Sequence, residues 1–317
     1  MNFDAYVFAD TREMTREEWL EKRKQGIGGS EASAIMGLNP YSSPLRVYLD
    51  KIGKAEEKVT TEAMRQGTDL EAYVAERFCE ETGMKVRKVN KILQHPNYPW
   101  MLANIDRDIV GYNAGLECKT TSPYSKFKFD EGEINPHYYW QSMHYMAVTG
   151  AKKWYVAVLV LGKSFHVFEI DRDEKAINQL INAENDFWVN HVLKKDPPVP
   201  TGSDVDDEAL TDMYPVGEDS PDEVELDSFE TLLDLRELTV ARRDELDTEI
   251  KEYDQQLKRA LGKNQHGASV KWRVNWTNTT RNTIDGKMLR EKYPDIADEV
   301  TKTTTSRRFS VARMKED

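Results

Sequence analysis

The sequence predicts an α/β (α+β) body in which helices flank a mixed sheet, joined by an acidic linker to a small C-terminal appendage. Along residues 1–200, hydrophobic positions recur at helical spacing in some segments and alternate at strand spacing in others. Residues 201–227 contain eleven acidic side chains, no Lys or Arg, and Pro and Gly residues, a composition typical of a linker. Residues 228–317 form the appendage, a helix with a small basic α/β segment.

The helices of the body are predicted from their ends. Thr15 and Glu18 match a capping box, and Gly83 occupies the usual glycine position after a helix C-terminus. Pro136 stands at the favoured first position of another helix. The predicted helices cover residues 15–25, 31–36, 62–81, 136–149 and 174–193, with a helical turn at 44–52.

Strand-like alternation occupies the segments between these helices. Five strands are predicted, and the turn at residues 112–115 joins the second and third as a hairpin. The predicted strands cover residues 85–93, 101–110, 115–121, 154–161 and 164–170.

The appendage begins with an amphipathic helix over residues 228–262, whose apolar stripe must pack on the body, on a second copy or on the C-terminal strands. The stripe consists of Leu232, Leu235, Leu238, Leu246, Ile250, Tyr253 and Leu257. Strands at 268–276 and 305–313 and a helix at 286–292 follow. Bases interleaved with Trp272 and Trp276 suit DNA-backbone contact, a protein docking surface or a plain structural cap. We expect that removing the chain after Pro200 leaves a competent core with weaker DNA engagement or assembly.

Charge and composition exclude several classes of protein. The 317 residues carry a net charge of −12, of which residues 201–227 contribute −11, whereas residues 263–317 carry +5. The overall acidity therefore does not exclude a polyanionic partner. Hydrophobic residues make up 39%, which excludes wholesale disorder, and no segment reaches the roughly 18 apolar residues of a membrane helix. With two cysteines and no secretory signal at residues 1–10, we expect a cytoplasmic protein without a disulfide framework.

The most informative pattern is Asp106 followed by Glu117-x-Lys119. Glu117 and Lys119 are two apart on a strand and share a face, and a turn at 112–115 places Asp106 opposite about Thr121 on that face. Carboxylates bind Mg²⁺, which polarises a phosphate and acidifies water, while a lysine orients that water. The pattern indicates metal-assisted phosphodiester hydrolysis. The alternative is an ordinary ion pair on an exposed strand.

Glu71 is a further candidate on the helix at 62–81. It lies beside the apolar stripe that contains Gly67, Val74 and Phe78. Because an unpaired charge is costly to bury, this carboxylate needs a partner, and a metal or Lys119 would supply one. The alternative is a local pair with Arg77.

The glycine-rich segment 26–30 precedes a short helix. Ser30 and the free backbone N–H groups of that helix form a potential anion site, to which Arg23 would add a bidentate contact. The segment lacks the Gly-Lys-Ser/Thr ending of a nucleotide-binding loop, and the alternative is a plain turn between helices.

Three further side chains surround this pattern. Gln141 and Tyr145 share one face of the helix at 136–149, from which they are candidates to reach a sugar–phosphate backbone. Cys118 is expected to pack its thiol in the core on the opposite strand face, leaving its backbone carbonyl available to a metal. The six histidines lack metal-ligand spacing.

Five short motifs occur in order along residues 15–190: Arg23…Gly-Ile-Gly-Gly-Ser30, Gly67-x-x-x-Glu71, Asn104-Ile-Asp106, Leu-Glu117-Cys-Lys119-Thr-Thr-Ser and Gln141-x-x-x-Tyr145. The set resembles the phage-type recombination exonucleases, the YqaJ-like and lambda-exonuclease-like branch of the PD-(D/E)XK nuclease superfamily. The resemblance implies an exonuclease dependent on Mg²⁺, with Mn²⁺ as a substitute, that degrades one strand of duplex DNA 5′→3′ from an end. It also implies a phage or prophage protein, a single-strand annealing partner and, as in the best-studied members, a trimer.

The resemblance also implies roles for individual residues. Asp106 and Glu117 resemble the metal-binding carboxylates, Lys119 the water-orienting lysine and Glu71 the helix-borne acid that supports a second metal. Of the remaining motif residues, Arg23 and Ser30 resemble the pair that recognises a 5′-phosphate, and Gln141 and Tyr145 the pair near the scissile strand.

Two departures from the family pattern stand out. Arg107 follows the first acid where many members of the superfamily carry glycine, and the chain after residue 201 lies outside the shared core. Two other functions remain open, a RecB-like repair or defence nuclease and a catalytically inactive DNA-end-binding or scaffold protein. The intact Asp106, Glu117 and Lys119 argue against an inactive protein.

Overall fold

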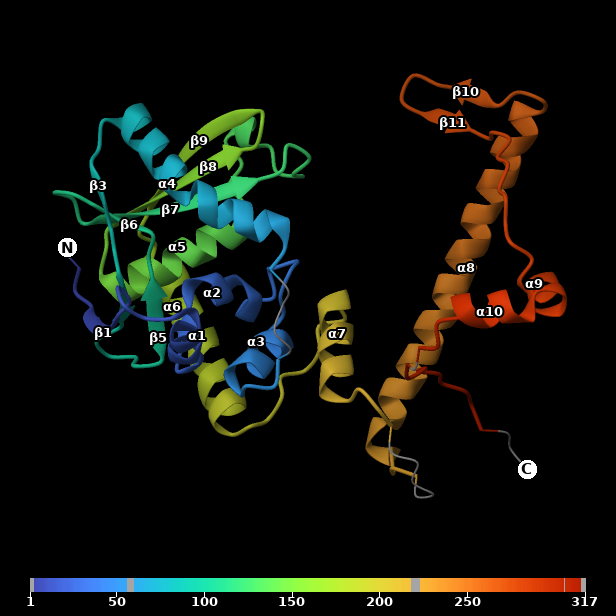
Figure 1. The fold of residues 1–317 in the computed structure, drawn as a ribbon, viewed down its shortest axis with the longest axis horizontal. Helices are drawn as coiled ribbons and strands as arrows, with labels where there is room; N and C mark the ends of the chain where they lie inside the picture. The colour runs from blue at the N-terminus through green and yellow to red at the C-terminus, as the bar shows by residue number, and fades with distance from the viewer. Residues whose placement is uncertain (1–2, 56–59, 218–222, 305, 315–317) are drawn as a thin grey trace. The chain divides into compact units, whose positions relative to one another are not determined.

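The computed structural model describes residues 3–55, 60–217, 223–304 and 306–314. The chain divides into two compact units, Met1–Pro215 and Val216–Asp317, each of which we describe by itself (Figure 1). Among the helices of the described residues, none combines the length and the apolar character needed to span a bilayer.

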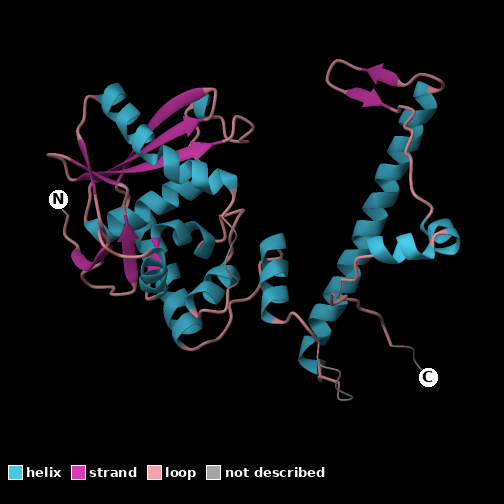
Figure 2. Cartoon of the chain, viewed as in Figure 1, coloured by secondary structure: helices cyan, strands magenta, loops and turns pink. Residues whose placement is uncertain are grey.

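The first unit contains a five-stranded mixed sheet in the order β3-β6-β7-β8-β9 (Figure 2). β7 and β8 are parallel, and the other neighbours are antiparallel. The strands are β3 (Val86–Lys88), β6 (Arg107–Ile109), β7 (Ala114–Thr121), β8 (Lys153–Val160) and β9 (Ser164–Asp171). The α-helices of this unit are α1 (Arg16–Lys24), α2 (Gly29–Ile35), α3 (Pro44–Lys51), α4 (Glu62–Thr82), α5 (Pro136–Thr149), α6 (Glu174–Asp186) and α7 (Asp204–Met213).

Helices α4 and α5 cover opposite faces of this sheet. Tyr155 and Ala157 of β8 pack in one hydrophobic cluster with Phe78 of α4. The alternate β8 residue Val156 packs in another cluster with Met143 of α5. Since successive residues of a strand point to opposite faces, the two clusters lie on the two sides of the sheet. The predicted fold class, helices flanking a mixed sheet, is confirmed.

A second, four-stranded sheet has the order β1-β4-β5-β2. Its strands are β1 (Tyr6–Asp10), β4 (Lys91–Gln94), β5 (Met101–Asn104) and β2 (Ile27–Gly28). β1 and β2 were not predicted, and the strands predicted at 85–93 and 101–110 are each divided between the two sheets. Asp106 therefore lies where the chain crosses from β5 of one sheet to β6 of the other.

The predicted register of the β6–β7 hairpin was wrong. Arg107 pairs with Leu116, so Asp106 comes beside Glu117 and Cys118 instead of Thr121. The turn is shifted toward the N-terminus because Gly111 adopts a φ of +86°, a left-handed conformation that favours glycine. The shift brings Asp106 closer to Glu117 than the sequence indicated.

The first part of the predicted linker is an ordered helix. Within residues 201–227, α7 packs on α3, and Ala209 is fully buried in a cluster with Leu45 and Leu49. Asp212 forms an ion pair with Arg46 of α3. The acidity of this segment therefore reflects helix capping and ion pairing as well as solvation, and α7 belongs to the first unit.

Two shorter helical segments complete the first unit. The predicted helix at 174–193 begins as α6 and continues as the π-helical segment η2 (Phe187–Leu193). The 3₁₀ turn η1 (Phe129–Glu131) precedes α5.

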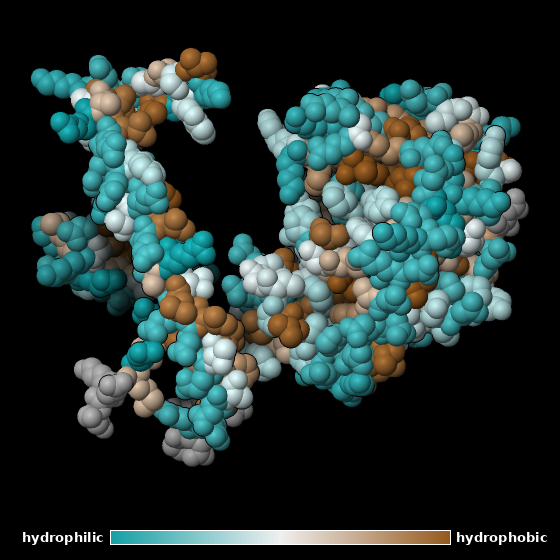
Figure 3. Space-filling view, turned by 180° about the vertical axis from the view of Figure 1, so that it is seen from behind, coloured by the Kyte–Doolittle hydropathy of each residue, from teal (hydrophilic) through white to brown (hydrophobic). Residues whose placement is uncertain are grey.

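The second unit is centred on one long helix, α8 (Glu230–Leu261). The apolar stripe predicted on it is exposed along its length, as the hydrophobic side chains along α8 in Figure 3 show. The strand predicted at 268–276 is instead a hairpin, and over the described part of 305–313 no strand forms, residue 305 being outside the described residues. The other elements are η3 (Asp227–Phe229), β10 (His266–Ala268), β11 (Arg273–Asn275), α9 (Gly286–Lys292) and α10 (Pro294–Val300).

Candidate active site

Glu117 is the buried centre of the candidate site. It projects from β7 with 5% of its surface exposed. Its Oε1 accepts hydrogen bonds from Lys119 Nζ at 2.7 Å and from Gln141 Nε2 at 2.7 Å. Its Oε2 is buried and, among the described residues, has no hydrogen-bond partner. One carboxylate oxygen is thus fixed by two donors and the other is left for a ligand.

Asp106 meets Glu117 from the crossing between the sheets. Its Oδ2 accepts a hydrogen bond of 2.8 Å from the backbone N–H of Cys118. Burial, with the negative charges of Glu117 and Glu71, raises the pKa of Asp106 well above its ordinary value of 3.8. Two carboxylates this close repel each other, and a bound cation would relieve that repulsion.

Lys119 remains charged beside these acids. Burial alone would lower the pKa of its ammonium group, but the charges of Glu117 and Asp106 and the hydrogen bond to Glu117 outweigh burial and raise it. The ammonium group also lies 5.5 Å from the ring centroid of Tyr138 on α5. A lysine held in this way is a hydrogen-bond donor and not a proton acceptor.

Glu71 reaches the site through a partner that the sequence did not indicate. Its Oε1 lies 2.5 Å from Arg107 Nη1, and Arg107 also donates to the backbone carbonyl of Asp106 at 2.8 Å. Arg77, the alternative partner considered from the sequence, pairs with Glu80. Arg107 therefore links the α4 carboxylate to the Asp106 backbone.

Gln141 and Tyr145 form a buried support instead of an exposed contact pair. Their exposed fractions are 3% and 4%, so Gln141 is covered by its neighbours and the small exposed part of Tyr145 lines the cavity described below. Gln141 Nε2 donates both to Glu117 and to the Tyr145 hydroxyl, the latter at 2.8 Å. Burial raises the pKa of Tyr145 well above its ordinary value, so the phenol stays protonated.

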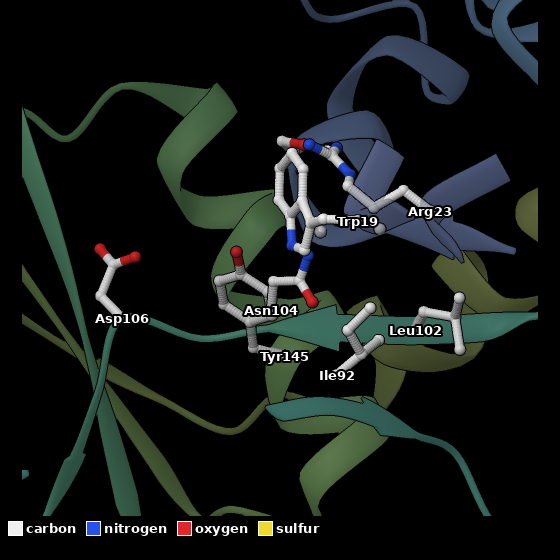
Figure 4. Close-up of a pocket in the computed structure, with 10 residues that line it drawn as sticks. Trp19, Arg23, Ile92, Leu102, Asn104, Asp106 and Tyr145 are labelled. Atoms are coloured by element: carbon white, nitrogen blue, oxygen red, sulfur yellow. Dashed lines mark hydrogen bonds between the residues drawn. The ribbon is translucent and has the colours of Figure 1, made fainter. Parts of the chain in front are cut away.

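A cavity of about 170 Å³ opens beside this group (Figure 4). Asp106 lines one end, Tyr145 the floor, and Arg23 the opposite end, with Trp19 beside it. Arg23 Nη2 donates to Ser30 Oγ at 3.0 Å, and its guanidinium lies 4.7 Å from the Trp19 ring. The structure thus places the predicted Arg23–Ser30 pair and one of the carboxylates, Asp106, on the lining of one cavity.

The glycine-rich segment is required for the close packing of this cavity. A Cβ at Gly29 would lie 2.5 Å from the Tyr145 ring, closer than real side chains approach. Gly28 N donates to Glu31 Oε2 at 2.8 Å, which satisfies a free donor at the start of α2. The segment is therefore a packed helix start and not a loose turn.

A buried ion pair and a buried histidine–carboxylate hydrogen bond near the site were missed from the sequence. Lys51, whose side chain is fully buried, donates to Glu31 at 2.8 Å and to the Arg23 carbonyl at 3.0 Å. His144 Nδ1 lies 2.7 Å from Glu184, both fully buried. A lysine and an acid in helical segments give no sequence signal of pairing, because the partners lie on different elements.

Cys118 occupies the predicted position. Its side chain is partly buried and packs against the hydrophobic cluster beneath α4, away from the carboxylates. Burial raises the pKa of the thiol, which keeps it protonated and unreactive.

The residues present fit a hard divalent cation. Among the described residues, Glu117 Oε2 is a buried oxygen without a partner, and the pKa of Asp106 is raised by burial and by neighbouring negative charge. Carboxylate and carbonyl oxygens are the donors that Mg²⁺ prefers. In the described residues, no group of three or more His, Cys, Asp or Glu side chains converges, because Glu71 is turned toward Arg107.

The helix-flanked mixed sheet thus brings two acids and a lysine together, Asp106 from the crossing into β6 and Glu117 and Lys119 from β7. Residues 18–152 match the family model of the YqaJ-like viral recombinase domain. The chain is 37% identical to protein YqaJ of Bacillus subtilis (strain 168) over an alignment of 311 residues, and this alignment covers 97% of each chain. The chain belongs to the YqaJ family, which confirms the predicted resemblance.

Two solved structures are also similar to this chain. One is an alkaline exonuclease from Laribacter hongkongensis, at 20% identity and a TM-score of 0.48, covering 56% of this chain and 93% of that one. The other is a phage-related exonuclease from Haemophilus somnus 129PT, at 11% identity and a TM-score of 0.43, covering 54% and 96%.

Proposed function

We propose that this protein is a metal-dependent deoxyribonuclease that degrades one strand of linear duplex DNA in the 5′→3′ direction. The observation that carries the proposal is the buried group of Asp106, Glu117 and Lys119, in which Asp106 lines a cavity whose other end holds Arg23 and Ser30. An acid and an anion-binding group on one cavity, with a second acid and a charged lysine bonded behind that acid, suit a phosphodiester near a DNA end.

Asp106, Glu117 and the Cys118 carbonyl would hold Mg²⁺, with Glu71 supporting a second ion and Mn²⁺ as a substitute. Bound Mg²⁺ supplies Lewis-acid neutralisation of the phosphate charge and acidifies water. Gln141 holds one oxygen of Glu117, so that the other faces the ligand. Tyr145 in turn holds Gln141.

Lys119 would orient the attacking water by donating a hydrogen bond, since its ammonium group stays charged beside Glu117 and Asp106. Its position is fixed by the 2.7 Å bond to Glu117. The role proposed for this lysine is therefore positioning and charge stabilisation, not proton abstraction.

Arg23 and Ser30 would bind the 5′-terminal phosphate of the degraded strand. The guanidinium keeps a positive charge available because Glu31, its acidic neighbour at 3.6 Å, is also paired with buried Lys51. Lys51 also lies 3.8 Å from Asp50, so the positive charge offered to an anion here is that of the Arg23 guanidinium, which donates to Ser30 Oγ.

The direct test is digestion of two linear duplexes of the same sequence. In one, a chosen strand is labelled at its 5′ end, and in the other the same strand is labelled at its 3′ end. With Mg²⁺, we expect early release of the 5′-label as a mononucleotide, late loss of the 3′-label and no reaction in EDTA. Release of the 3′-label first would exclude the proposed polarity. A chain that binds ends but cuts neither strand would support the end-binding alternative.

Three further proposals follow from family membership. We propose that the protein acts on DNA ends in phage or prophage recombination inside the bacterial cytoplasm, together with a single-strand annealing protein. A homo-oligomer, a trimer by resemblance, is also proposed, and native mass spectrometry of the full chain tests it.

A further inference from the structure

A basic segment of the second unit contains no acidic residue. Residues 255–284 include six Lys or Arg and one His but no Asp or Glu, although the whole chain carries −12. The bases are Lys258, Arg259, Lys263, Lys271, Arg273 and Arg281. Within the described second unit, the ion pairs involve Arg243 and Arg313 instead. The positive charge of this segment is therefore not used to hold the fold together.

The structure gathers the middle of this segment into a hairpin. After α8 ends at Gly262, β10 and β11 pair antiparallel, with Ala268 opposite Arg273. Ser269 closes the turn, since its N–H donates to the Trp272 carbonyl at 2.8 Å and its Oγ accepts from Trp272 N at 3.1 Å. Two bases, Lys271 at the turn and Arg273 on β11, are thus presented on a defined structure.

The same hairpin carries large apolar side chains in solvent. Trp272 is 75% exposed, Trp276 is 50% exposed and Val270 at the turn is fully exposed. Figure 3 shows hydrophobic side chains among hydrophilic ones at this end of α8. Trp272 stands directly before β11 and Trp276 directly after it, and Arg273 is the first residue of the strand. Exposed indole rings of this kind mark a contact surface, because burying them would be favourable.

We propose that the β10–β11 hairpin, with the basic residues around it, binds single-stranded DNA. Unpaired Lys and Arg side chains attract phosphates, and exposed indole rings stack on bases. Duplex DNA would use only the charges, since its base faces are covered by stacking. The combination of both features therefore favours a single strand over a duplex. This inference does not rest on the proposed nuclease activity, although such a nuclease would produce a single strand.

The test uses the full-length protein in EDTA, so that no cleavage occurs, with a fluorescein-labelled dT₃₀ strand and a blunt duplex of equal length. Fluorescence anisotropy gives both affinities across a salt series. For Trp272→Ala/Trp276→Ala, we expect affinity for dT₃₀ to fall about tenfold or more, with duplex affinity almost unchanged. For Lys271→Glu/Arg273→Glu, the slope of log affinity for dT₃₀ against log salt concentration should become shallower by about 1.4. Each of the two lost phosphate contacts accounts for about 0.7 of this change.

Matched variants separate the hairpin from general effects. Lys287→Glu/Lys292→Glu on α9 changes the net charge equally in the same unit, and Tyr293→Ala removes another exposed aromatic ring. Both should bind dT₃₀ like the wild type, and Trp272→Phe/Trp276→Phe should keep most of the affinity. Unchanged dT₃₀ binding by the Trp-to-Ala variant overturns the proposal. The proposal is also overturned if the Trp-to-Ala variant loses duplex and dT₃₀ affinity equally. It is overturned as well if the α9 charge control lowers dT₃₀ binding as much as Lys271→Glu/Arg273→Glu does.

Discussion

The two units place their charged and apolar residues in opposite ways. In the first unit, charged groups such as Glu117, Lys51 and Glu184 are buried and held by named partners. In the second, apolar groups along α8 and on the hairpin lie in solvent. Buried charge is costly and is retained where a fixed electrostatic geometry is needed, whereas exposed apolar surface marks contact with another molecule. The difference indicates chemistry in the first unit and contacts in the second.

The largest effect should come from removing a charge of the buried group. We expect Glu117→Gln or Lys119→Ala to lower the rate of duplex digestion by on the order of 10³-fold or more, since several kcal/mol of transition-state stabilisation is lost. Asp106→Ala should do the same. The measurement is single-turnover digestion with Mg²⁺, with circular dichroism to confirm folding.

The control is Glu81→Gln, which removes an exposed carboxylate near the C-terminal end of α4. It should digest duplex at the wild-type rate. A folded Glu117→Gln protein that retains near-normal activity would remove the carboxylate pair from the mechanism.

The next effect concerns the other end of the cavity. If Arg23 binds a terminal phosphate, the wild type should degrade a 5′-phosphorylated duplex faster than a 5′-hydroxyl duplex. Arg23→Ala should reduce that preference about tenfold, the value of a charge-assisted hydrogen bond of roughly 1.5–3 kcal/mol. Rates on both substrates measure it, with Lys22→Ala on the same helix as the control. Equal wild-type rates on the two ends would exclude a phosphate pocket.

The pH dependence of thermal stability measures how far Asp106 destabilises the metal-free fold beside Glu117 and Glu71. The pKa of Asp106 is raised above 3.8 by burial and by neighbouring acids, so the folded metal-free protein binds this proton more tightly than the unfolded chain does. The stability that this group contributes is thus present at low pH and lost as the pH rises from 3.8 through the raised pKa. Asp106→Asn should therefore raise the melting temperature of EDTA-treated protein more at pH 8 than at pH 4.

Thermal melts across that pH range, with and without Mg²⁺, provide the measurement. In the wild type, Mg²⁺ should recover stability at pH 8, because a cation offsets the repulsion, and in Asp106→Asn it should do so less. An Asp106→Asn protein with the same pH profile as the wild type would show that this acid carries no such repulsion.

Local sequence signals predicted much of the fold and of the site. Caps at Thr15 and Gly83 fix the ends of α1 and α4 within a residue or two, because capping depends on neighbours in sequence. The Glu117–Lys119 pairing also follows from strand alternation alone. The Glu71–Arg107 pair could not be found in this way, since it joins α4 to β6 across 36 positions.

The errors share one physical cause, which is dependence on contacts distant in sequence. The division of residues 85–110 between two sheets is decided by which strand each half pairs with, not by its own pattern. Likewise, α7 has a linker composition, but Ala209 and Asp212 find partners on α3. Local composition cannot show such partners.

The smallest effect on catalysis should come from deleting the second unit, provided that the truncated protein retains α7. Truncation after Pro215 removes only the second unit, so we expect a folded protein that digests duplex within about twofold of the full-length rate. Truncation after Pro200 also removes α7, exposes the cluster around Leu45 and leaves Arg46 without Asp212. That loss should cost on the order of 3 kcal/mol of unfolding free energy.

Urea unfolding and duplex digestion of both truncated proteins decide between a boundary at 200 and one at 215. The earlier cut should shift the urea midpoint downward relative to the later one, while the two retain the same active residues. If the two truncated proteins are equally stable, α7 is not part of the folded body. If the later cut abolishes digestion, the second unit contributes to catalysis itself, and the division between chemistry and contacts fails.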